Sequence, residues 1–280
     1  MIKIEVLYEY FLDSRGVVTD SRKDLKGKIF FALKGPNFNG NQYAVEAIKN
    51  GAKYAVVDEL IDSENTKLLL VRDVLSTLQT LAYTHRKKLG TFIVGITGTN
   101  GKTTNKELLH SALKQKFNCY ATKGNLNNQI GVPLSLLELN DSHDMAIIEM
   151  GASKPGDIKE LCEIADPDCG FITNIGYAHL EGFGTKEAIR QEKGELFVHV
   201  RNNNGTFYVN ENSKDVVKVA ANYSDNVFIG EGEDAHYQFT CVKCIPTVEL
   251  MYDGKSIKST IYGKHNYENL KMSAGIALHL

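Results

Sequence analysis

Gly98-Thr99-Asn100-Gly101-Lys102-Thr103-Thr104 follows the apolar run at residues 91–96 and precedes a segment in which apolar residues recur at helical spacing. Glycines let backbone N–H groups curve around phosphate oxygens, and a helix N-terminus adds the positive end of its dipole. The spacing Gly98-x-x-Gly101-Lys102-Thr103 is shorter than the common pattern G-x-x-x-x-G-K-[ST], because Ile96 stands where its first glycine would fall. The stretch predicts a strand, a phosphate-binding loop and a helix, with a plain glycine-rich turn as the alternative.

Three side chains in or near this loop are suited to binding a nucleotide and its metal ion. Lys102 can reach the β- and γ-phosphates, and the Thr103 hydroxyl can bind Mg²⁺. Glu149 ends the apolar strand expected at residues 145–149. Its carboxylate should therefore emerge at the carboxyl edge of a parallel sheet, where such folds bind ligands. An ordinary acidic strand end is the alternative to metal binding.

The rest of this half of the chain alternates between strands and helices. Strands are expected at residues 145–149 and 170–175, and helices at residues 155–164 and 186–198. This alternation predicts an α/β fold with a mainly parallel sheet covered by helices on both faces. After Gly205 the pattern becomes β-rich, and Asp253-Gly254 between two β-prone runs predicts a type I′ hairpin.

The first ninety residues predict a separate, small α/β unit. Apolar runs of strand length lie at residues 29–33, 54–57 and 68–71. One helix is expected from Asn41 to the Asn50-Gly51 stop, and another from Val74 to the basic residues before Gly90. We therefore expect two domains, residues 1–90 and 91–280, a division that suits a chain of this length.

Composition and charge argue against several classes of protein. The 280 residues carry 32 Lys and Arg against 34 Asp and Glu, which is unlike a strongly basic nucleic-acid-binding protein. No apolar run approaches the roughly 18 residues of a membrane-spanning helix, and residues 1–5 show no export signal. We expect a cytoplasmic protein with reduced cysteines. Cys241 and Cys244 have the spacing of a redox or zinc pair, but no second pair accompanies them, so a structural role is expected.

Lys193 has an unusual position in the helix expected at residues 186–198. It is four residues after Ile189 and three and four residues before Leu196 and Phe197, so it projects from the apolar face. Such a lysine either extends its ammonium to solvent or has a chemical role. His179 lies in the loop before this helix, where a lone histidine is more often a surface residue than a ligand.

Several stretches of the chain resemble the Mur ligases, which build the cytoplasmic peptide precursor of the bacterial cell wall, and they occur in the order that this family shows. The phosphate loop is one of them, and the first unit matches through residues 20–22 (DSR) and 32–35 (ALKG). The others lie at residues 124–133, 148–152, 174–184, 193–197 and 263–269. The resemblance covers essentially the whole chain, and motifs in the right order are more specific than any one of them.

The resemblance implies an ATP-dependent ligase that joins D-alanyl-D-alanine to a UDP-N-acetylmuramoyl-tripeptide. The peptide carboxylate would attack the γ-phosphate of ATP, giving an acyl phosphate and ADP. The amine of the dipeptide would then displace phosphate. The implied architecture is a small N-terminal domain that binds the UDP precursor and a central P-loop ATPase domain with a β-rich C-terminal part.

The resemblance also implies roles for single residues. Thr103 and Glu149 would share one Mg²⁺ with ATP, and His179 would bind a second together with Lys193 carbamylated by CO₂. The implied catalytic residues are Lys102, His179 and Lys193. Asn266 and Asn269 would contact adenine, with helix capping as the alternative. The implied contacts to the UDP end of the substrate are Asp20, Ser21, Arg22, Asn39 and Gly40. An amide-rich loop suited to a sugar or phosphate, or else to turn formation, contains Asn125, Asn127 and Asn128.

Other functions stay open on these grounds. A diamino-acid-adding ligase of the same family shares the phosphate loop and the Asp-Ser-Arg motif, although residues 125–128 and 149–152 favour the dipeptide-adding branch. Folate polyglutamylating ligases lack the UDP unit, and a non-catalytic nucleotide- or precursor-binding module is the alternative from another class. No residue resembles the third, C-terminal domain of these ligases, and the last expected helix stops at Leu280. We expect a monomeric fragment that binds small molecules, neither nucleic acid nor membrane, and does not complete turnover alone.

Overall fold

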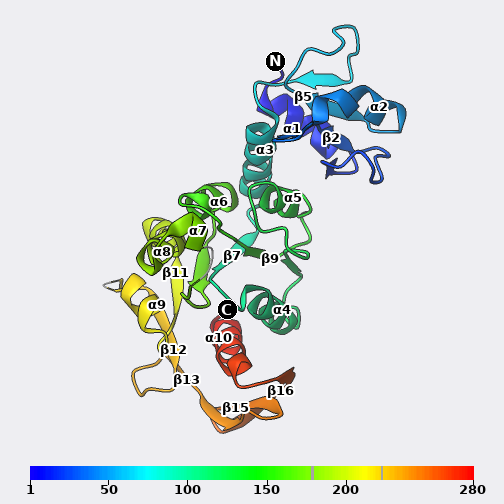
Figure 1. Ribbon diagram of the computed structural model, residues 1–280. Helices are drawn as coiled ribbons and strands as arrows, with labels where there is room; N and C mark the ends of the chain where they lie inside the picture. The colour runs from blue at the N-terminus through cyan, green and yellow to red at the C-terminus, as the bar shows by residue number, and fades with distance from the viewer. Residues whose placement is uncertain (178–179, 222) are drawn as a thin grey trace. The chain divides into compact units, whose positions relative to one another are not determined.

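The computed structural model describes residues 1–177, 180–221 and 223–280 and divides the chain into two compact units. The first comprises Met1–Gly90 and Pro133–Leu139, and the second comprises Thr91–Val132 and Asn140–Leu280 (Figure 1). Residues 133–139 were expected with the second unit, and they cluster with the first. A buried hydrogen bond between Nε2 of His85 and the Leu139 carbonyl, 2.9 Å long, accounts for part of that association.

The first unit is a four-stranded parallel sheet with the order β1-β2-β5-β6. Its strands are β1 Val17–Val18, β2 Ile29–Phe31, β5 Tyr54–Val57 and β6 Leu68–Leu70. Its helices are α1 Ile4–Leu12, α2 Ala44–Lys49 and α3 Val74–Leu89, with a 3₁₀ turn at Gly40–Tyr43 and a hairpin of β3 Lys34–Gly35 and β4 Phe38–Asn39. Alanines of α2 pack against Phe30, Ala55 and Val57 of the sheet. The small α/β unit expected from the sequence is therefore present.

The second unit is built on a seven-stranded parallel sheet with the order β13-β12-β11-β10-β7-β9-β8. Its strands are β7 Phe92–Thr97, β8 Cys119–Ala121, β9 Met145–Glu149, β10 Cys169–Ile172, β11 Thr206–Asn210, β12 Asn226–Gly230 and β13 Tyr237–Gln238. The helices are α4 Lys102–Leu113, α6 Asp157–Ala165, α7 Leu180–Phe183, α8 Lys186–Asn202, α9 Lys214–Val219 and α10 His265–His279. Helix α5 Gly131–Leu136 begins in this unit, and its residues from Pro133 on belong to the first unit. The expected α/β class and the mainly parallel sheet are confirmed.

Helices cover both faces of this sheet. Apolar residues of α4 and α10 form one core with the strands, and α6 and α8 pack on the opposite face (Figure 1). Gly95 and Gly170 are paired in register on β7 and β10, and a Cβ on either would lie within 3.2 Å of a Leu196 methyl. The two glycines therefore let α8 approach the sheet closely. Lys193 lies one helical turn before Leu196, toward the carboxyl edge of the strands, because α8 runs antiparallel to them.

The segment after Gly205 is β-rich as expected, and its first part continues the parallel sheet. Strands β11, β12 and β13 add to one side of that sheet, with α9 between β11 and β12. The antiparallel part consists of β14 Thr240–Lys243, β15 Thr247–Tyr252 and β16 Lys255–Tyr262. Asp253 (φ +46°) and Gly254 (φ +70°) connect β15 to β16. Positive φ at both central residues is the type I′ geometry that the Asp-Gly pair predicted.

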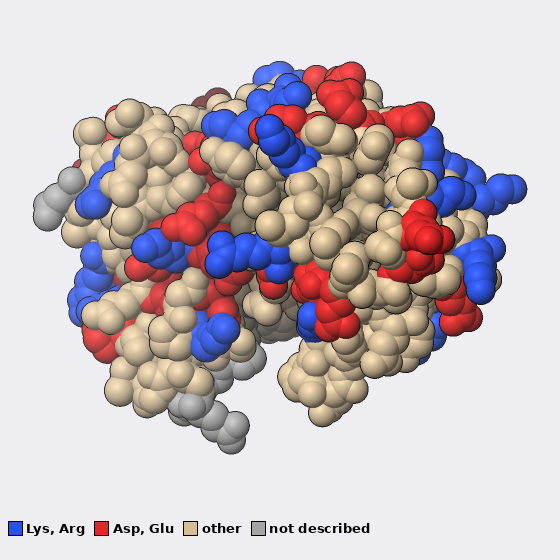
Figure 2. Space-filling model, turned by 90° about the horizontal axis from the view of Figure 1, so that it is seen from above, with Lys and Arg blue, Asp and Glu red and all other residues tan. Residues whose placement is uncertain are grey.

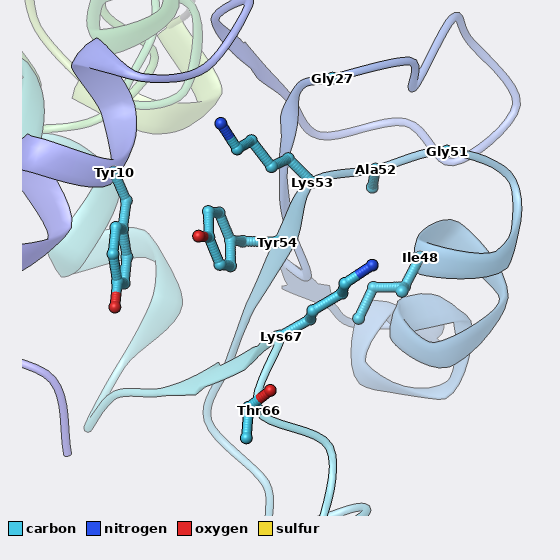
Figure 3. A pocket seen from close by; sticks show the side chains of 9 residues that line it. All are labelled: Tyr10, Gly27, Ile48, Gly51, Ala52, Lys53, Tyr54, Thr66 and Lys67. Atoms are coloured by element: carbon cyan, nitrogen blue, oxygen red, sulfur yellow. The ribbon is translucent and has the colours of Figure 1, made fainter.

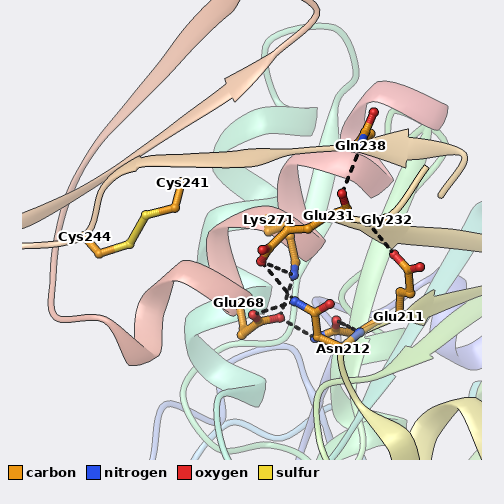
Figure 4. A network of polar contacts seen from close by, with 10 residues as sticks. Glu211, Asn212, Glu231, Gly232, Gln238, Cys241, Cys244, Glu268 and Lys271 are labelled. Carbon is orange, nitrogen blue, oxygen red and sulfur yellow. Dashed lines mark hydrogen bonds and ion pairs between the residues drawn. A yellow bond between two sulfur atoms is a disulfide. The ribbon is translucent and has the colours of Figure 1, made fainter. Parts of the chain in front are cut away.

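A disulfide and an ion-pair cluster lie in the C-terminal part of the second unit (Figure 4). Cys241 and Cys244 are joined by a disulfide, so the expectation of reduced thiols was wrong for this pair. The strand register is irregular between Cys241 and Lys243, next to this bond. Cys119, Cys162 and Cys169 are free and buried.

The ion-pair cluster ties α10 to the ends of β11 and β12. Nζ of the buried Lys271 lies 2.9 Å from Oε2 of Glu268 and 3.7 Å from Oε1 of Glu231. The amide of Asn212 donates to the same two carboxylates, at 3.2 and 3.1 Å. Because α10 also packs against α4, the cluster helps to place the C-terminal helix beside the phosphate loop.

In the described part of the chain, no helix is both long and apolar enough to span a bilayer. On the face shown in Figure 2, lysines and arginines are interspersed with aspartates and glutamates, in keeping with a formal net charge of −2.

Candidate functional site

The phosphate-type loop leaves β7 at the carboxyl edge of the sheet and leads into α4. Gly98 (φ +149°) and Gly101 (φ +77°) have backbone conformations that favour glycine. Gly101 is the N-cap of α4, and no side chain caps this helix, so its first N–H groups are available to an anion. Nζ of Lys102 bonds the carbonyls of Gly98 and Thr99 at 2.9 and 3.3 Å. Burial lowers the pKa of Lys102, and the charge of Glu149 partly opposes this effect.

Two residues after β10 hold this loop, and neither was assigned a role from the sequence. The amide of Asn174 accepts from the Asn100 N–H at 3.0 Å and donates to the Asn100 carbonyl at 2.9 Å. The Thr173 hydroxyl donates to the same carbonyl at 2.6 Å. Asn174 is the first residue of the stretch 174–184 that resembles the family, and this resemblance was the sequence signal that could have identified it. The loop conformation is therefore fixed by the neighbouring strand β10.

Glu149 lies beside the loop because β9 is the neighbour of β7, with Ile96 and Glu149 in register. The carboxylate is buried; its Oε2 accepts from the Thr103 hydroxyl at 3.2 Å and its Oε1 from the Asn127 amide at 2.9 Å. Mg²⁺ prefers oxygen ligands at about 2.1 Å in octahedral geometry, which puts neighbouring ligand oxygens about 3 Å apart. The Thr103 and Glu149 oxygens fit that requirement. Among the described residues, no group of three or more His, Cys, Asp or Glu forms a metal cluster.

A cavity of about 410 Å³ opens next to the loop, within the second unit. It is lined by Lys102, by Asn127, Asn128 and Gln129, by Gly151, Ala152 and Ser153, and by Asp157, Glu160 and Leu161 of α6. Of the three loop asparagines, Asn127 and Asn128 line the cavity and Asn125 does not. Oδ1 of Asn128 also accepts from the N–H groups of Ile130 and Gly131 at the start of α5. The turn-forming alternative therefore applies to Asn128, whereas Asn127 is bound to Glu149.

Lys193 is buried in α8, so the solvent-exposed alternative is excluded. Burial, together with the positive charge of Lys102, lowers the pKa of Lys193 to about 8, and Glu192 opposes the shift. Glu192 was not singled out from the sequence, yet its carboxylate accepts from the N–H groups of Gly156 and Ile158 at 2.7 and 2.6 Å and so caps α6. The expected partner of Lys193, His179, lies outside the described residues.

Asn266 and Asn269 lie in the first turns of α10 and are joined to the phosphate loop by a chain of amides. Asn269 donates to Oδ1 of Asn266 at 2.8 Å and accepts from the amide of Asn105 at 2.8 Å. The Asn105 amide also donates to the Gly101 carbonyl at 2.9 Å. The two asparagines are thus fixed relative to the loop. Asn105 is a further residue that sequence reasoning missed, and no local pattern marks it.

The site residues expected in the first unit fall in two places. Asp20 and Arg22 form an exposed ion pair at 2.8 Å, and the hydrogen bonds from Arg22 hold the pKa of Asp20 well below its usual range. Ser21 and Arg22 line a pocket of about 550 Å³, together with Tyr43 and neighbouring residues. Asn39 and Gly40 do not line it. Asn39 instead donates to Glu59 and caps the turn at Gly40, where a Cβ would lie 2.4 Å from the Leu33 carbonyl.

A second pocket of the first unit, of about 600 Å³, contains none of the expected residues (Figure 3). Tyr10 and Tyr54 stack on one side of it with their centroids 4.5 Å apart, and Lys53 and Lys67 project from the strand beginnings. It lies at the amino edge of the sheet, opposite to the edge where parallel sheets bind ligands. Lys53 is paired with Asp13 at 2.6 Å. We assign no function to this pocket.

Comparison with known proteins places this geometry in a family. The model of the Mur ligase middle domain matches residues 96–277. The UDP-N-acetylmuramoyl-tripeptide–D-alanyl-D-alanine ligases of Bacillus subtilis and Synechocystis sp. are 33% and 35% identical over 91% and 93% of the chain. A crystal structure of MurF from Acinetobacter baumannii covers 99% of the chain with a TM-score of 0.86 at 29% identity. The MurF ligase of Thermotoga maritima in complex with ADP covers 96% with a TM-score of 0.83 at 31% identity.

The match is nearly complete for this chain and partial for its relatives. The chain spans 56% and 57% of the two curated ligases and 64% of each of the two solved structures. The matched region includes the phosphate loop, the strand-end glutamate and the start of α10, where the site geometry lies. The chain belongs to the Mur ligase family.

Proposed function

We propose that this chain is the precursor- and ATP-binding part of a cytoplasmic ligase that joins D-alanyl-D-alanine to a UDP-N-acetylmuramoyl-tripeptide in peptidoglycan synthesis. One arrangement carries the proposal: the Thr103 hydroxyl bonds the Glu149 carboxylate next to Lys102, and Lys102 lines the cavity of about 410 Å³. These three side chains supply the cation and the two oxygen ligands that phosphoryl transfer from ATP requires. Curated relatives that match more than 90% of the chain support the choice of acceptor and amine.

Each residue of the site has its own proposed role in this reaction. Lys102 and the uncapped N–H groups of α4 bind the phosphates and orient the γ-phosphoryl group. Thr103 and Glu149 would hold Mg²⁺, which would supply positive charge to neutralise the phosphate oxygens. Asn127 aligns Glu149, and Asn266 and Asn269 position the base. The substrate carboxylate attacks the γ-phosphate to give an acyl phosphate and ADP, and the dipeptide amine then displaces phosphate.

Lys193 belongs to the same proposal as the site of a carbamate, which together with His179 would hold a second Mg²⁺. Carbamylation requires a neutral amine, which attacks CO₂ and releases one proton. At pH 8 about half of an amine with a pKa of about 8 is neutral, against well under one per cent at the ordinary value of 10.5. Supplying ¹³C-labelled bicarbonate should produce a carbamate carbon resonance in the unmodified chain. The Lys193→Ala variant should lack that resonance, and its persistence there would exclude Lys193 as the modified residue.

Nucleotide binding tests the core of the proposal, with Mg²⁺·ADP titrated calorimetrically into the 280-residue chain. Lys102→Ala should weaken binding by about 10- to 100-fold, because charge-assisted hydrogen bonds contribute about 1.5–3 kcal/mol. Lys114→Ala, which removes a lysine from the C-terminal end of the same helix, is the matched control and should bind as the unmodified chain does. Equal binding by both variants would contradict the role of Lys102.

Precursor binding separates the proposed acceptor from its nearest alternative. The dipeptide-adding ligase binds UDP-N-acetylmuramoyl-tripeptide, whereas a diamino-acid-adding ligase acts on the shorter dipeptide precursor. Arg22→Ala should weaken binding of the preferred precursor, since Arg22 lines the pocket of the first unit. Tighter binding of the dipeptide precursor would favour the diamino-acid-adding function. The expectation that the chain does not complete turnover alone is tested by phosphate release with D-alanyl-D-alanine present.

A further inference from the structure

Lys106 is a fully buried lysine that none of the roles above uses. It lies in α4, three residues after Thr103, so the two side chains share a helix face. None of its surface is exposed to solvent. Lysines are rarely buried to this extent, since removing an ammonium from water is costly unless it is paired.

The ammonium of Lys106 joins three elements of the site. Its Nζ donates to the Gly124 carbonyl at 3.2 Å, at the start of the amide-rich loop. It also lies 3.7 Å from Oε2 of Glu149 at the end of β9, and 3.4 Å from the exposed carboxylate of Glu107. In the described part of the chain, Lys106 is the cation within ion-pair distance of Glu149. Lys106 thus connects helix α4 to the amide-rich loop at Gly124 and to the end of β9 at Glu149.

Glu149 is held on several sides, and Lys106 provides the charged contact. Oε2 of Glu149, the oxygen that faces Lys106, accepts from the Thr103 hydroxyl, and Oε1 accepts from Asn127. The N–H of Glu149 donates to the Thr122 hydroxyl at 3.0 Å. A carboxylate so bound keeps one orientation, which preorganised ligand sites require.

We propose that Lys106 is a positioning residue of the nucleotide site, whose ammonium fixes the Glu149 carboxylate against Thr103 and anchors the amide-rich loop through Gly124. This inference rests on the proposed function for the identity of the ligand. The coupling between Lys106 and Glu149 is a property of the chain without any ligand, so it can be tested independently. Lys106 does not line the cavity, so the role proposed for it is positioning rather than catalytic.

Two physical readings of Lys106 predict opposite responses to Mg²⁺. If the lysine positions Glu149, the Lys106→Met variant releases the carboxylate, and the gain in ADP affinity that Mg²⁺ brings should fall at least tenfold. If the lysine only repels a nearby cation, its removal should increase that gain. ADP affinity without Mg²⁺ should change less than threefold in either case, since Lys106 does not line the cavity.

The experiment measures ADP binding with and without Mg²⁺ for the unmodified chain, Lys106→Met and the matched control Lys114→Met. It also measures thermal unfolding, without ligand, of Lys106→Met, Glu149→Gln and the double variant. We expect the Mg²⁺-dependent gain to fall only in Lys106→Met. We also expect the fall in melting temperature of the double variant to be well below the sum of the falls of the two single variants, as for residues that interact.

An unchanged or larger Mg²⁺-dependent gain, or additive melting shifts, would overturn the proposal. If Lys106→Met does not fold, the double variant decides: a folded double variant supports the pairing with Glu149, and an unfolded one contradicts it. If the unmodified chain does not bind Mg²⁺·ADP, the proposed function fails, and the melting cycle still decides the coupling of Lys106 to Glu149.

Discussion

The buried amine of Lys193 should make the stability of the chain depend on pH in a defined window. In the folded chain its pKa is lowered to about 8 by burial and by the charge of Lys102, against 10.5 for an unperturbed lysine. Between these two values the unfolded chain binds more protons than the folded chain. The free energy of unfolding contributed by Lys193 must therefore rise with pH across the window. Below pH 8 the full penalty of the buried cation applies, and above pH 10.5 it is gone.

The size of this effect follows from the shift. A pKa difference from 10.5 to about 8 corresponds to about 3 kcal/mol, at about 1.4 kcal/mol per unit. This is a large fraction of the roughly 5–15 kcal/mol by which a domain is stable. Lys193→Met keeps the length of the side chain and removes the charge. We compare the free energy of unfolding of the variant with that of the unmodified chain at each pH. The advantage of the variant should be about 3 kcal/mol larger at pH 7.5 than at pH 10.5.

Urea unfolding followed by circular dichroism, in buffers free of CO₂, measures both proteins at the two pH values. The comparison must be a difference, because other groups titrate in the same range. Burial raises the pKa of the thiols of Cys119, Cys162 and Cys169 and of Tyr208, which lowers stability as the pH rises above about 9. These contributions are common to both proteins and cancel. A difference that stays constant within about 0.5 kcal/mol would show that Lys193 titrates normally, and the argument for a neutral amine near pH 8 would be refuted.

Three shorter predictions concern the residues around the loop. Gly98→Ala should lower the free energy of unfolding by about 3 kcal/mol in urea titrations, because its Cβ would lie 1.9 Å from the Thr173 hydroxyl at a φ of +149°. The control is Gly90→Ala, which has a positive φ but open surroundings and should lower that free energy by about 1 kcal/mol. Glu149→Gln should reduce the Mg²⁺-dependent gain in ADP affinity about tenfold in calorimetric titrations, and an unchanged gain would remove it from the metal site. Glu192→Gln should lower the unfolding free energy by about 1–3 kcal/mol, because its new NH₂ group would face the N–H of Gly156 or of Ile158, both of which the carboxylate caps at the start of α6. Unchanged stability would contradict that cap.

Local signals were sufficient for the elements that carry the phosphate loop. Strand β7, the two positive-φ glycines and helix α4 follow from apolar runs and glycine spacing within about twenty residues. The β15–β16 hairpin follows in the same way from Asp253-Gly254. Helix α1 was not predicted, although Leu7, Tyr8 and Phe11 have helical spacing and are buried. Its start at Lys3 has no capping side chain and its end at Asp13 no glycine, so the usual boundary signals are missing.

The site was predictable only where topology brings strand ends together. Glu149 ends β9 and Thr103 lies just after the loop that leaves β7, so both were expected at the carboxyl edge of one parallel sheet; the pairing of β7 with β9 brings them together. The bond between Asn105 and Asn269 joins residues 164 positions apart, and the bonds of Asn174 to the loop span 74 positions. Asparagine in a helix or after a strand has many ordinary uses. No local pattern distinguishes Asn105 from other asparagines, and Asn174 was marked only by its place in the stretch 174–184 that resembles the family.

The buried lysines of the second unit show why charge is harder to predict than apolar packing. Helical spacing indicates that Lys193 faces the core, but it says nothing about which charges it meets, because those come from other elements. Lys106 and Lys271 lie within ion-pair distance of Glu149 and Glu268, so their ammonium groups serve to hold carboxylates in place. The charge of Lys102, by contrast, adds to burial in lowering the pKa of Lys193. Lys193 should therefore lose its proton near pH 8, as the proposed reaction with CO₂ requires, and this difference in surroundings distinguishes it from the two lysines that lie beside carboxylates.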